Sequence, residues 1–329
     1  MTFDVHAHCI PDGVLDTLRA DPDRYGIEVA GDAVRIAGRV DIRALRADLG
    51  DLEARLKAMD ATGVRTQLLS SWIDLTAYAL DAGAGARYAR MFNEAMAATV
   101  AAHPERFAAL ATVPLQAPTR AAEELRHAVT ALGMVGVEIA TTVDGRELDE
   151  PDLDPFWEAA QDLRCLVLVH PLTSLAGRGL RRYFLGNLVG NPAETTIAIA
   201  HLIFGGVLER FPDLVVCLVH GGGFLPYQRG RLDRGYRAQA ELTAEHLSRP
   251  PEEYLRRLYY DTVTHDPEAL AFLLDFVGPR QVVLGSDYPF EMGDPDPVAT
   301  VKAIPGLDDE TRDLVLRGNV QRILDGVRR

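Results

Sequence analysis

The stretch Phe3-Asp4-Val5-His6-Ala7-His8 shows the alternation of apolar and polar side chains that is typical of a β-strand. In a strand, residues i and i+2 project from the same side, so His6 and His8 point together from the carboxyl end of this segment. Two neutral imidazoles side by side form half of a site for zinc or a similar divalent ion. The remaining ligands must then come from the ends of other strands.

The order of the predicted elements indicates the fold class. Eight short runs rich in β-forming residues predict strands at Phe3–His8, Thr66–Ser70, Phe107–Val113, Val135–Ile139, Cys165–His170, Leu214–His220, Leu258–Thr262 and Gln281–Gly285. Amphipathic patterns between them predict helices at Asp51–Ala61, Met91–Ala102, Pro118–Leu132, Asp154–Leu163, Ala193–Arg210, Pro267–Phe276 and Asp309–Leu324.

Strands that alternate with helices favour parallel pairing and right-handed crossovers. We therefore predict an α/β protein that is a single (β/α)₈ TIM barrel over residues 1–329. A doubly wound open sheet is the alternative, but no G-x-G-x-x-G motif follows the first strand.

One segment departs from the alternation. Within residues 11–40, Ile27-Glu-Val-Ala and Ala33-Val-Arg-Ile-Ala flank Gly31-Asp32, which is a β-hairpin signal. We interpret residues 11–40 as a small β-hairpin insertion that forms a lid over the barrel mouth, where substrate contacts and solvent exclusion are expected.

Composition excludes several partners. The formal net charge of −14 disfavours binding to nucleic acid or to an anionic membrane surface. No leader-like segment opens the chain, and no run approaches the ~18 apolar residues of a membrane span. Cys9, Cys165 and Cys217 are odd in number and widely spaced, which favours reduced thiols and a cytoplasmic protein. We interpret Cys165 and Cys217 as core residues of their strands.

Further polar residues stand at predicted strand ends. His170 ends the fifth strand, His220 ends the sixth, and Asp287 follows the eighth. A lone histidine at a strand end is more often structural, but three such ends in register with His6 and His8 predict a metal site. His265 follows the seventh strand, where a supporting role near the site and a purely structural role are both open.

This order of ligands resembles that of the amidohydrolase superfamily, and more narrowly its branch typified by 2-amino-3-carboxymuconate-6-semialdehyde decarboxylase. The resemblance covers nearly the whole chain and is weakest over residues 11–40. It rests on Leu188-Val-Gly-Asn-Pro-Ala-Glu-Thr-Thr196, Phe204-Gly-Gly-Val-Leu-Glu-Arg-Phe-Pro212, His220-Gly-Gly-Gly-Phe-Leu-Pro226 and Gly285-Ser-Asp-Tyr-Pro-Phe290.

The resemblance implies a set of roles for individual residues. It implies that Zn²⁺, or another divalent ion such as Mn²⁺, is bound by His6, His8, His170 and Asp287, and that a water completes the shell. His220 matches the general base, and Asp287 orients it or relays protons. Arg46 and Arg231 match two arginines that hold the substrate's carboxylates. Because the second arginine comes from the neighbouring subunit in the family, the resemblance also implies a homodimer.

The predicted function is metal-dependent, non-oxidative decarboxylation of a small unsaturated or aromatic carboxylic acid, with no organic cofactor. A metal-dependent hydrolase or hydratase on the same barrel is an alternative, because metal-bound hydroxide is a general nucleophile. A catalytically silent barrel that acts as a binding or scaffold protein is another.

Two sequence details bear on the substrate. The family commonly has His-Pro-Trp where this chain has His170-Pro171-Leu172, so the particular acid is open. In decarboxylases of hydroxylated benzoates, Glu often stands in place of the first histidine, so His6 favours the muconate-type metal shell.

Overall fold

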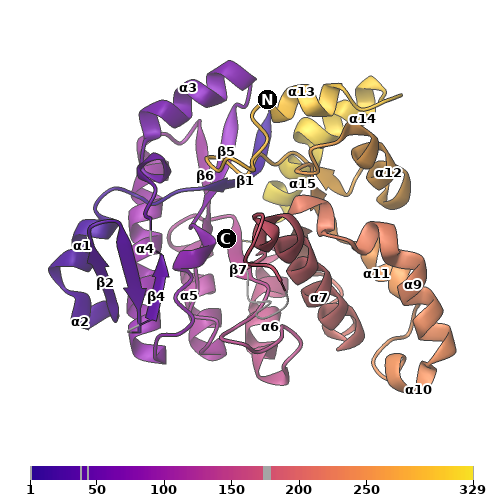
Figure 1. Ribbon diagram of the computed structural model, residues 1–329, viewed down its shortest axis with the longest axis horizontal. Helices are drawn as coiled ribbons and strands as arrows, with labels where there is room; N and C mark the ends of the chain where they lie inside the picture. The colour runs from indigo at the N-terminus through magenta and orange to yellow at the C-terminus, as the bar shows by residue number, and fades with distance from the viewer. Residues whose placement is uncertain (1, 38, 43, 173–178, 329) are drawn as a thin grey trace.

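The sheet at the centre of the molecule contains eight parallel strands. The computed structural model describes residues 2–37, 39–42, 44–172 and 179–328. Each strand pairs in parallel with the strands beside it. In spatial order the strands are β1 (Phe3–His8), β5 (Thr66–Ser70), β6 (Phe107–Ala111), β7 (Gly136–Ala140), β8 (Leu166–His170), β9 (Val215–Leu218), β10 (Tyr259–Asp261) and β11 (Val282–Val283). Figure 1 shows β1, β5, β6 and β7 of this sheet with helices around them.

The sheet closes on itself between its first strand and the segment after its last. The backbone N–H of Val5 donates to the carbonyl of Leu284 (2.9 Å), and that of Asp287 donates to the carbonyl of His6 (2.8 Å). The N–H of His8 donates to the carbonyl of Tyr288 (2.8 Å). These bonds confirm the predicted barrel over the open sheet, and they place Asp287 beside the two histidines of β1.

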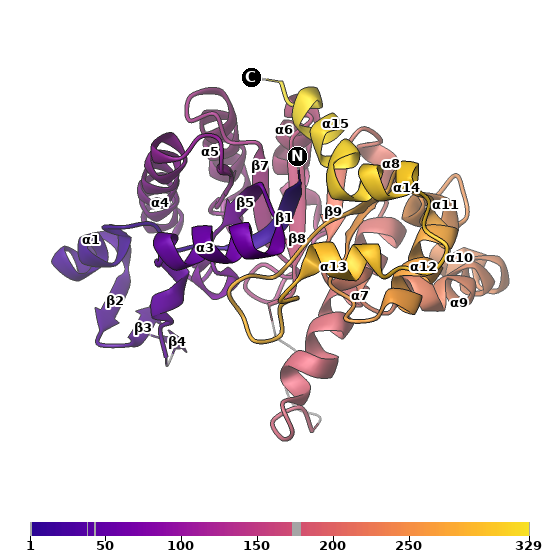
Figure 2. The same ribbon diagram turned by 90° about the horizontal axis from the view of Figure 1, so that it is seen from above.

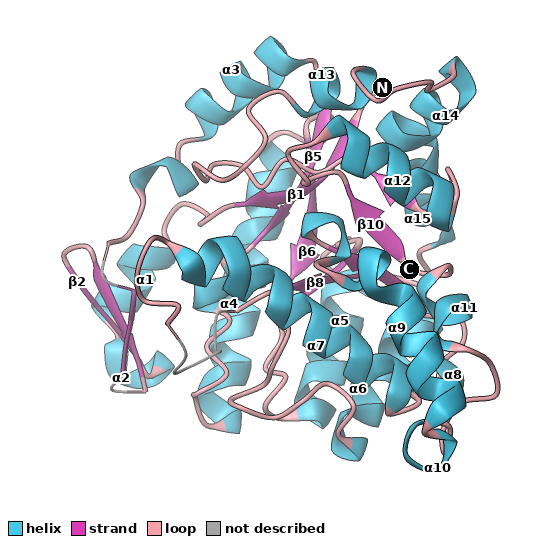
Figure 3. Cartoon of the chain, turned by 45° about the vertical axis from the view of Figure 1, so that its right-hand side comes forward, coloured by secondary structure: helices cyan, strands magenta, loops and turns pink. Residues whose placement is uncertain are grey.

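Helices surround the barrel, as Figures 2 and 3 show. No helix among the described residues combines the length and hydrophobicity needed to cross a bilayer. Those outside the insertion are α3 (Leu52–Thr62), α4 (Ala82–Ala102), α5 (Pro118–Thr130), α6 (Asp154–Leu163), α7 (Asn191–Phe204), α8 (Val207–Arg210), α9 (Leu225–Ala238), α10 (Ala240–Thr243), α11 (Pro251–Leu255), α12 (Pro267–Val277), α13 (Pro297–Lys302), α14 (Asp309–Asp313) and α15 (Asn319–Gly326).

Strand β8 shows how the barrel positions a site residue. Leu166 and Leu168 belong to one buried apolar cluster, and Val167 and Val169 belong to another. Successive side chains of a strand point to opposite faces, so the two clusters lie on the two sides of the sheet. His170 continues the series of Leu166 and Leu168. Packing of both faces therefore fixes the direction in which this histidine points.

Some predicted boundaries differ from those observed. His220, predicted as the last residue of a strand, lies beyond β9 in the 3₁₀ turn η5 (His220–Gly222) and has a φ of 54°. The helix predicted at Ala193–Arg210 is two helices, α7 and α8. Gly206 separates them with a φ of +73°, a backbone conformation that ends a helix and that glycine adopts without a Cβ penalty.

The predicted hairpin of the insertion is present and is part of a larger unit. Strands β2 (Ile27–Ala30) and β3 (Ala33–Ile36) pair antiparallel, and a third strand, β4 (Arg39–Ile42), pairs with β3. Helices α1 (Val14–Ala20) and α2 (Pro22–Tyr25) precede them and contact α4, on the left of Figure 1. The described residues that line the cavities at the strand ends come from other segments, so the lid role remains a prediction.

Candidate metal centre

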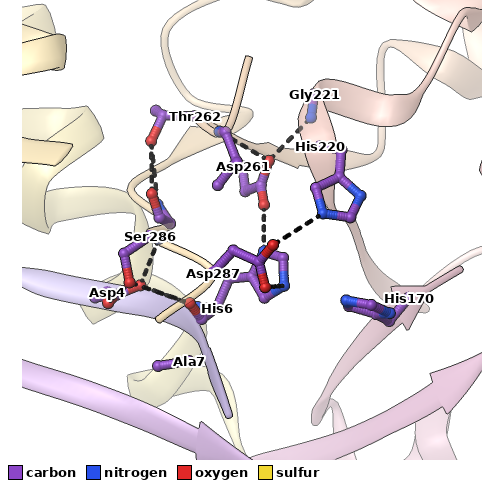
Figure 4. A network of polar contacts seen from close by, with 12 residues as sticks. Asp4, His6, Ala7, His170, His220, Gly221, Asp261, Thr262, Ser286 and Asp287 are labelled. Carbon is purple, nitrogen blue, oxygen red and sulfur yellow. Dashed lines mark hydrogen bonds and ion pairs between the residues drawn. The ribbon is translucent and has the colours of Figure 1, made fainter. Parts of the chain in front are cut away.

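Five polar side chains converge where the barrel strands end. His6 and His8 lie on β1, His170 ends β8, His220 begins the turn after β9, and Asp287 follows β11. The ring centroid of His6 lies 5.1 to 5.3 Å from those of the other three histidines. Figure 4 shows the Asp287 carboxylate between the imidazoles of His6 and His220. The structure thus brings together all five residues that the strand ends predicted.

Three donor atoms form a nearly equilateral triangle. Nε2 of His6 lies 3.2 Å from Nε2 of His8, and Oδ1 of Asp287 lies 3.3 and 3.2 Å from these two nitrogens. Two donors bound at ~2.1 Å to one zinc ion lie roughly 3.0 Å apart at the octahedral angle and roughly 3.4 Å apart at the tetrahedral angle. The triangle therefore has the dimensions of three ligands on one metal ion.

A wider donor group includes the remaining two histidines. One ligand atom from each of His6, His170, His220 and Asp287 lies within 4.8 Å of the others. Distance alone thus admits both His170 and His220 as neighbours of the same ion. The hydrogen bonds of their second ring nitrogens distinguish the two.

The Nδ1 atoms of two histidines are anchored by backbone carbonyls. Nδ1 of His8 lies 2.9 Å from the carbonyl oxygen of Ser71, and Nδ1 of His170 lies 2.9 Å from that of Pro171. A carbonyl oxygen only accepts, so both Nδ1 atoms carry the proton. In the neutral rings Nε2 then presents a lone pair to the centre, which is the arrangement of metal-binding histidines.

Asp261 anchors the third histidine. Its Oδ2 lies 2.7 Å from Nδ1 of His6, and its Oδ1 accepts the backbone N–H groups of Gly221 (2.9 Å) and Val263 (3.1 Å), as Figure 4 shows in part. Burial opposes the charge of this carboxylate, but the bonds from His6 and the backbone outweigh it and hold its pKa below the usual value. Our sequence reasoning missed Asp261. The available signal was a carboxylate at the end of a strand whose neighbours end in site residues.

The charge of Asp287 and those of the histidines around it shift one another's pKa values. Burial opposes its charge, but the imidazole of His6 outweighs that penalty, so the pKa of Asp287 is well below its usual value. For His6, Asp287 and Asp261 likewise outweigh burial and raise the pKa well above the usual value. Burial lowers the pKa of His170 well below the usual value. Oδ1 of Asp287 is buried without a hydrogen-bond partner among the described residues, which suits a cation ligand.

Two further buried groups support His8. Oε1 of Glu138 on β7 accepts from the hydroxyl of Ser70 (3.1 Å) and lies 3.7 Å from Nδ1 of His8, and burial raises the pKa of Glu138 to about 7. The buried guanidinium of Arg55 donates to the carbonyl of His8 (2.5 Å) and lies over the Tyr288 ring. Both were missed, although a charged residue within the apolar run 135–139 was a usable signal.

The two predicted arginines lie in different surroundings. The guanidinium of Arg46 pairs with Asp48 (2.6 Å) and Glu291 (2.7 Å) and lies over the ring of Phe290, which in turn contacts His8. Arg231 is exposed on α9 and is not among the described residues that line the cavities at the site. Their contacts with substrate carboxylates remain predictions.

Two cavities meet at the centre. One, of about 540 Å³, extends along an apolar wall that contains Phe224 and Phe272. The other, of about 420 Å³, extends past His170 toward Trp72 and Arg181. Both are lined by Asn187, Asn191, His220, Asp287 and Met292. A small molecule in either cavity reaches His220 and Asp287.

A barrel with histidines and an aspartate gathered at its strand ends belongs to the class of metal-dependent (β/α)₈-barrel enzymes. Comparison with known proteins narrows the class. A family model described as amidohydrolase matches residues 3–326, and the chain belongs to this family. The resemblance that the motifs indicated is thereby confirmed.

Its relatives include decarboxylases. The 2-amino-3-carboxymuconate-6-semialdehyde decarboxylase of Dictyostelium discoideum is 34% identical over 282 residues, which are 86% of this chain and 79% of the relative. The 5-carboxyvanillate decarboxylase of Sphingomonas paucimobilis is 28% identical, with a TM-score of 0.85 and 98% of both chains covered. A dihydroxybenzoic acid decarboxylase from Polaromonas sp. JS666, solved with bound manganese and an inhibitor, has the same fold at 23% identity. Its TM-score is 0.81, and 98% of this chain and 96% of that chain are covered.

Proposed function

We propose that this protein is a metal-dependent, non-oxidative decarboxylase of a small unsaturated or aromatic carboxylic acid. The observation that carries the proposal is a difference among the four site histidines. His6, His8 and His170 have Nδ1 anchored by an acceptor, whereas Nδ1 of His220 is buried with no hydrogen-bond partner among the described residues. An anchored ring suits a metal ligand, and an unanchored ring is free to exchange protons.

This difference assigns different roles to the residues of the centre. His6, His8, His170 and Asp287 hold the ion, which when bound acts as a Lewis acid toward a substrate oxygen and lowers the pKa of water. Nε2 of His220 lies 3.5 Å from Oδ2 of Asp287, so Asp287 can orient His220 or relay a proton to it. Both groups line the two cavities and therefore reach a bound acid.

Decarboxylation requires one proton and no oxidant. A carbon–hydrogen bond forms at the carbon that bears the carboxylate, and the carbon–carbon bond to that carboxylate breaks. The electron pair of the broken bond stays with the conjugated system of the acid, and CO₂ leaves. In this scheme His220 delivers the proton and Asp287 orients or relays it, and the low exposure of the centre keeps bulk water from competing.

The finer assignments follow the family resemblance. We assign Zn²⁺ as the native ion and Mn²⁺ as the alternative; the nitrogen-rich donor set supports zinc, and the manganese bound in the Polaromonas enzyme supports the alternative. We also propose a homodimer in which Arg231 of one protomer reaches the site of the other, which is consistent with its exposure on α9. The three cysteines are free and buried, which supports a cytoplasmic location.

Two alternatives are less well supported. Because the relatives described above are decarboxylases, the comparisons do not favour a hydrolase or a hydratase. A silent scaffold would have no need for four histidines and an aspartate whose donor atoms are brought close together.

Product analysis tests the proposal. The metal-loaded protein is incubated with a panel of unsaturated and aromatic acids, and CO₂ release is measured together with loss of the acid and water addition. We expect equimolar CO₂ and protonated product. Hydrolysis or hydration without CO₂ contradicts the proposal, and a purified chain that holds no divalent ion and gains no activity on metal addition supports the silent scaffold.

A further inference from the structure

The two cavities that meet at the metal centre give a bound acid different surroundings. The smaller one, of about 420 Å³, is lined by His170 as well as by His220 and Asp287. The larger one, of about 540 Å³, extends instead toward His265 and Phe272, and His170 is not among the described residues that line it. An acid in the smaller cavity therefore lies beside two of the proposed metal ligands and the proposed base.

Trp72 and Phe290 form an aromatic wall in the smaller cavity. Their ring centroids lie 5.9 Å apart with 51° between the ring planes, and both side chains are partly exposed. The ring of Phe290 also meets the imidazole of His8, with 5.3 Å between the centroids. The aromatic wall thus begins at a proposed metal ligand and extends into the space that an acid would fill.

The backbone that carries Trp72 is tied to the same histidine. The carbonyl of Ser71, the residue before Trp72, accepts the Nδ1 proton of His8 (2.9 Å). The carbonyl of Trp72 accepts the N–H of Leu75 (2.8 Å) at the start of the 3₁₀ turn η2 (Ile73–Leu75). It also accepts the hydroxyl of Ser71 (3.2 Å). The backbone of Trp72 is therefore fixed relative to the metal centre before a ligand binds, which lowers the ordering cost of binding.

The aromatic wall distinguishes between two kinds of acid. An aromatic ring that pairs with an indole gains attraction beyond the apolar area that it buries, because ring quadrupoles favour offset-stacked and edge-to-face arrangements. An open-chain acid has no ring to pair in this way. The larger cavity also has an aromatic side chain, Phe272, but its ring pairs with Tyr227 and Arg229 on α9 rather than with a proposed metal ligand. The smaller cavity is therefore the one that places an aromatic ring next to the metal centre.

We propose that the acid binds in the smaller cavity with its ring against the indole of Trp72, which makes Trp72 a specificity-determining residue. The contact favours aromatic acids over open-chain unsaturated acids, both of which the proposed function admits. The proposal rests on the proposed function, because it places the acid whose carboxylate leaves at the metal centre. From this cavity the acid can reach His220 and Asp287, which line it as well.

Tryptophan emission can locate a bound acid, because the two tryptophans of the chain lie in different surroundings. Trp157 on α6 is fully buried, its indole N–H donates to the carbonyl of Leu148 (3.2 Å), and it lines neither cavity. The zinc-loaded protein is titrated with benzoate and with sorbate, an open-chain conjugated acid, and is excited where neither acid absorbs. Calorimetry gives Kd for both acids with the unmodified protein, Trp72→Phe, Trp72→Leu and Phe272→Leu.

We expect benzoate to change the emission of the unmodified protein but not that of Trp72→Phe, which should still bind benzoate because it keeps an aromatic ring. Trp72→Leu should weaken benzoate binding by about 3- to 10-fold and leave sorbate within about twofold, as loss of one aromatic pair predicts. Phe272→Leu should bind both acids like the unmodified protein, because it changes the wall of the other cavity.

Four results overturn the proposal. They are unchanged emission at saturating benzoate, an equal loss for both acids in Trp72→Leu, a comparable loss of benzoate binding in Phe272→Leu, and no benzoate binding by the unmodified protein. Because binding needs no turnover, a protein that binds as expected yet releases no CO₂ contradicts only the proposed function.

Discussion

Nδ1 of His6 lies 2.7 Å from Oδ2 of Asp261, and both side chains are fully buried. The same carboxylate accepts the N–H of Gly221, the residue after His220. One side chain thus fixes the ring of a proposed metal ligand and the turn that carries the proposed base. Positions of this kind control metal affinity although they never touch the ion.

We expect Asp261→Asn to weaken metal binding by ~10- to 100-fold, because the amide carries no charge and its NH₂ group faces N–H donors. Metal content after dialysis against buffered Zn²⁺ or Mn²⁺ measures the effect. Asp275→Asn, an exposed position on α12, is the control and should bind metal normally. Normal affinity in Asp261→Asn would show that the His6 ring is held in place without this partner.

The sequence predicted the residues that converge at the proposed metal site but not the residues that orient them. His6, His8 and His170 were recognisable because strand period and strand end together specify where a side chain points. Asp261 and Glu138 were missed, since a carboxylate in a predicted strand does not show which side chains it contacts. That information lies in contacts between strands far apart in the chain.

The same reasoning explains the errors in the fold. Strand β11 contains only Val282 and Val283. The barrel closes through backbone hydrogen bonds of the residues after this strand, and such bonds produce no periodic pattern of apolar residues in the sequence. The third strand of the insertion, Arg39–Ile42, was not predicted. In contrast, Thr66–Ser70 is a strand that is buried along its whole length, and its predicted bounds match those observed.

The packing of β7 against β8 gives a prediction about stability. A Cβ on Gly136 would overlap the backbone carbonyl of Leu166 on the paired strand, and a backbone group in a closed barrel cannot move aside. We expect Gly136→Ala to lower the free energy of unfolding by about 2 to 3 kcal/mol. Gly230→Ala, which meets no atom within 4 Å on α9, should be neutral or slightly stabilising. Urea unfolding of the pair measures the difference, and equal midpoints would contradict the prediction.

The thiols of the three cysteines should be unreactive in the folded protein. Burial raises the pKa of Cys165 to about 12, that of Cys217 well above its usual value, and that of Cys9 above its usual value. At pH 8 the reactive thiolate is therefore nearly absent, and the sulfurs are also inaccessible. We expect a charged thiol reagent to label no cysteine in native protein and three after unfolding in denaturant. Rapid native labelling of Cys9 would instead indicate an accessible thiol beside the site.

His220→Asn separates proton transfer from metal binding. Asparagine accepts the left-handed backbone at this position, so the turn after β9 should be kept. We expect metal content to match that of the unmodified protein while kcat falls by ~10² to 10⁴, the usual contribution of a general acid or base. His246→Asn serves as the control. Parallel loss of metal and activity would instead make His220 a ligand, as its distance to the other donors also allows.

A mixture of two inactive variants tests whether Arg231 acts in the partner's site. In a mixed dimer of Arg231→Ala and His220→Asn protomers, the site with an intact His220 receives Arg231 from the His220→Asn protomer. We expect the mixture, after exchange of subunits, to recover a substantial fraction of activity, because half of the sites in each mixed dimer are complete. If Arg231 acted within its own chain, each protomer would lack one required group and mixing would restore nothing. Size-exclusion chromatography of both variants must first show dimers, since a monomer would contradict the assignment directly.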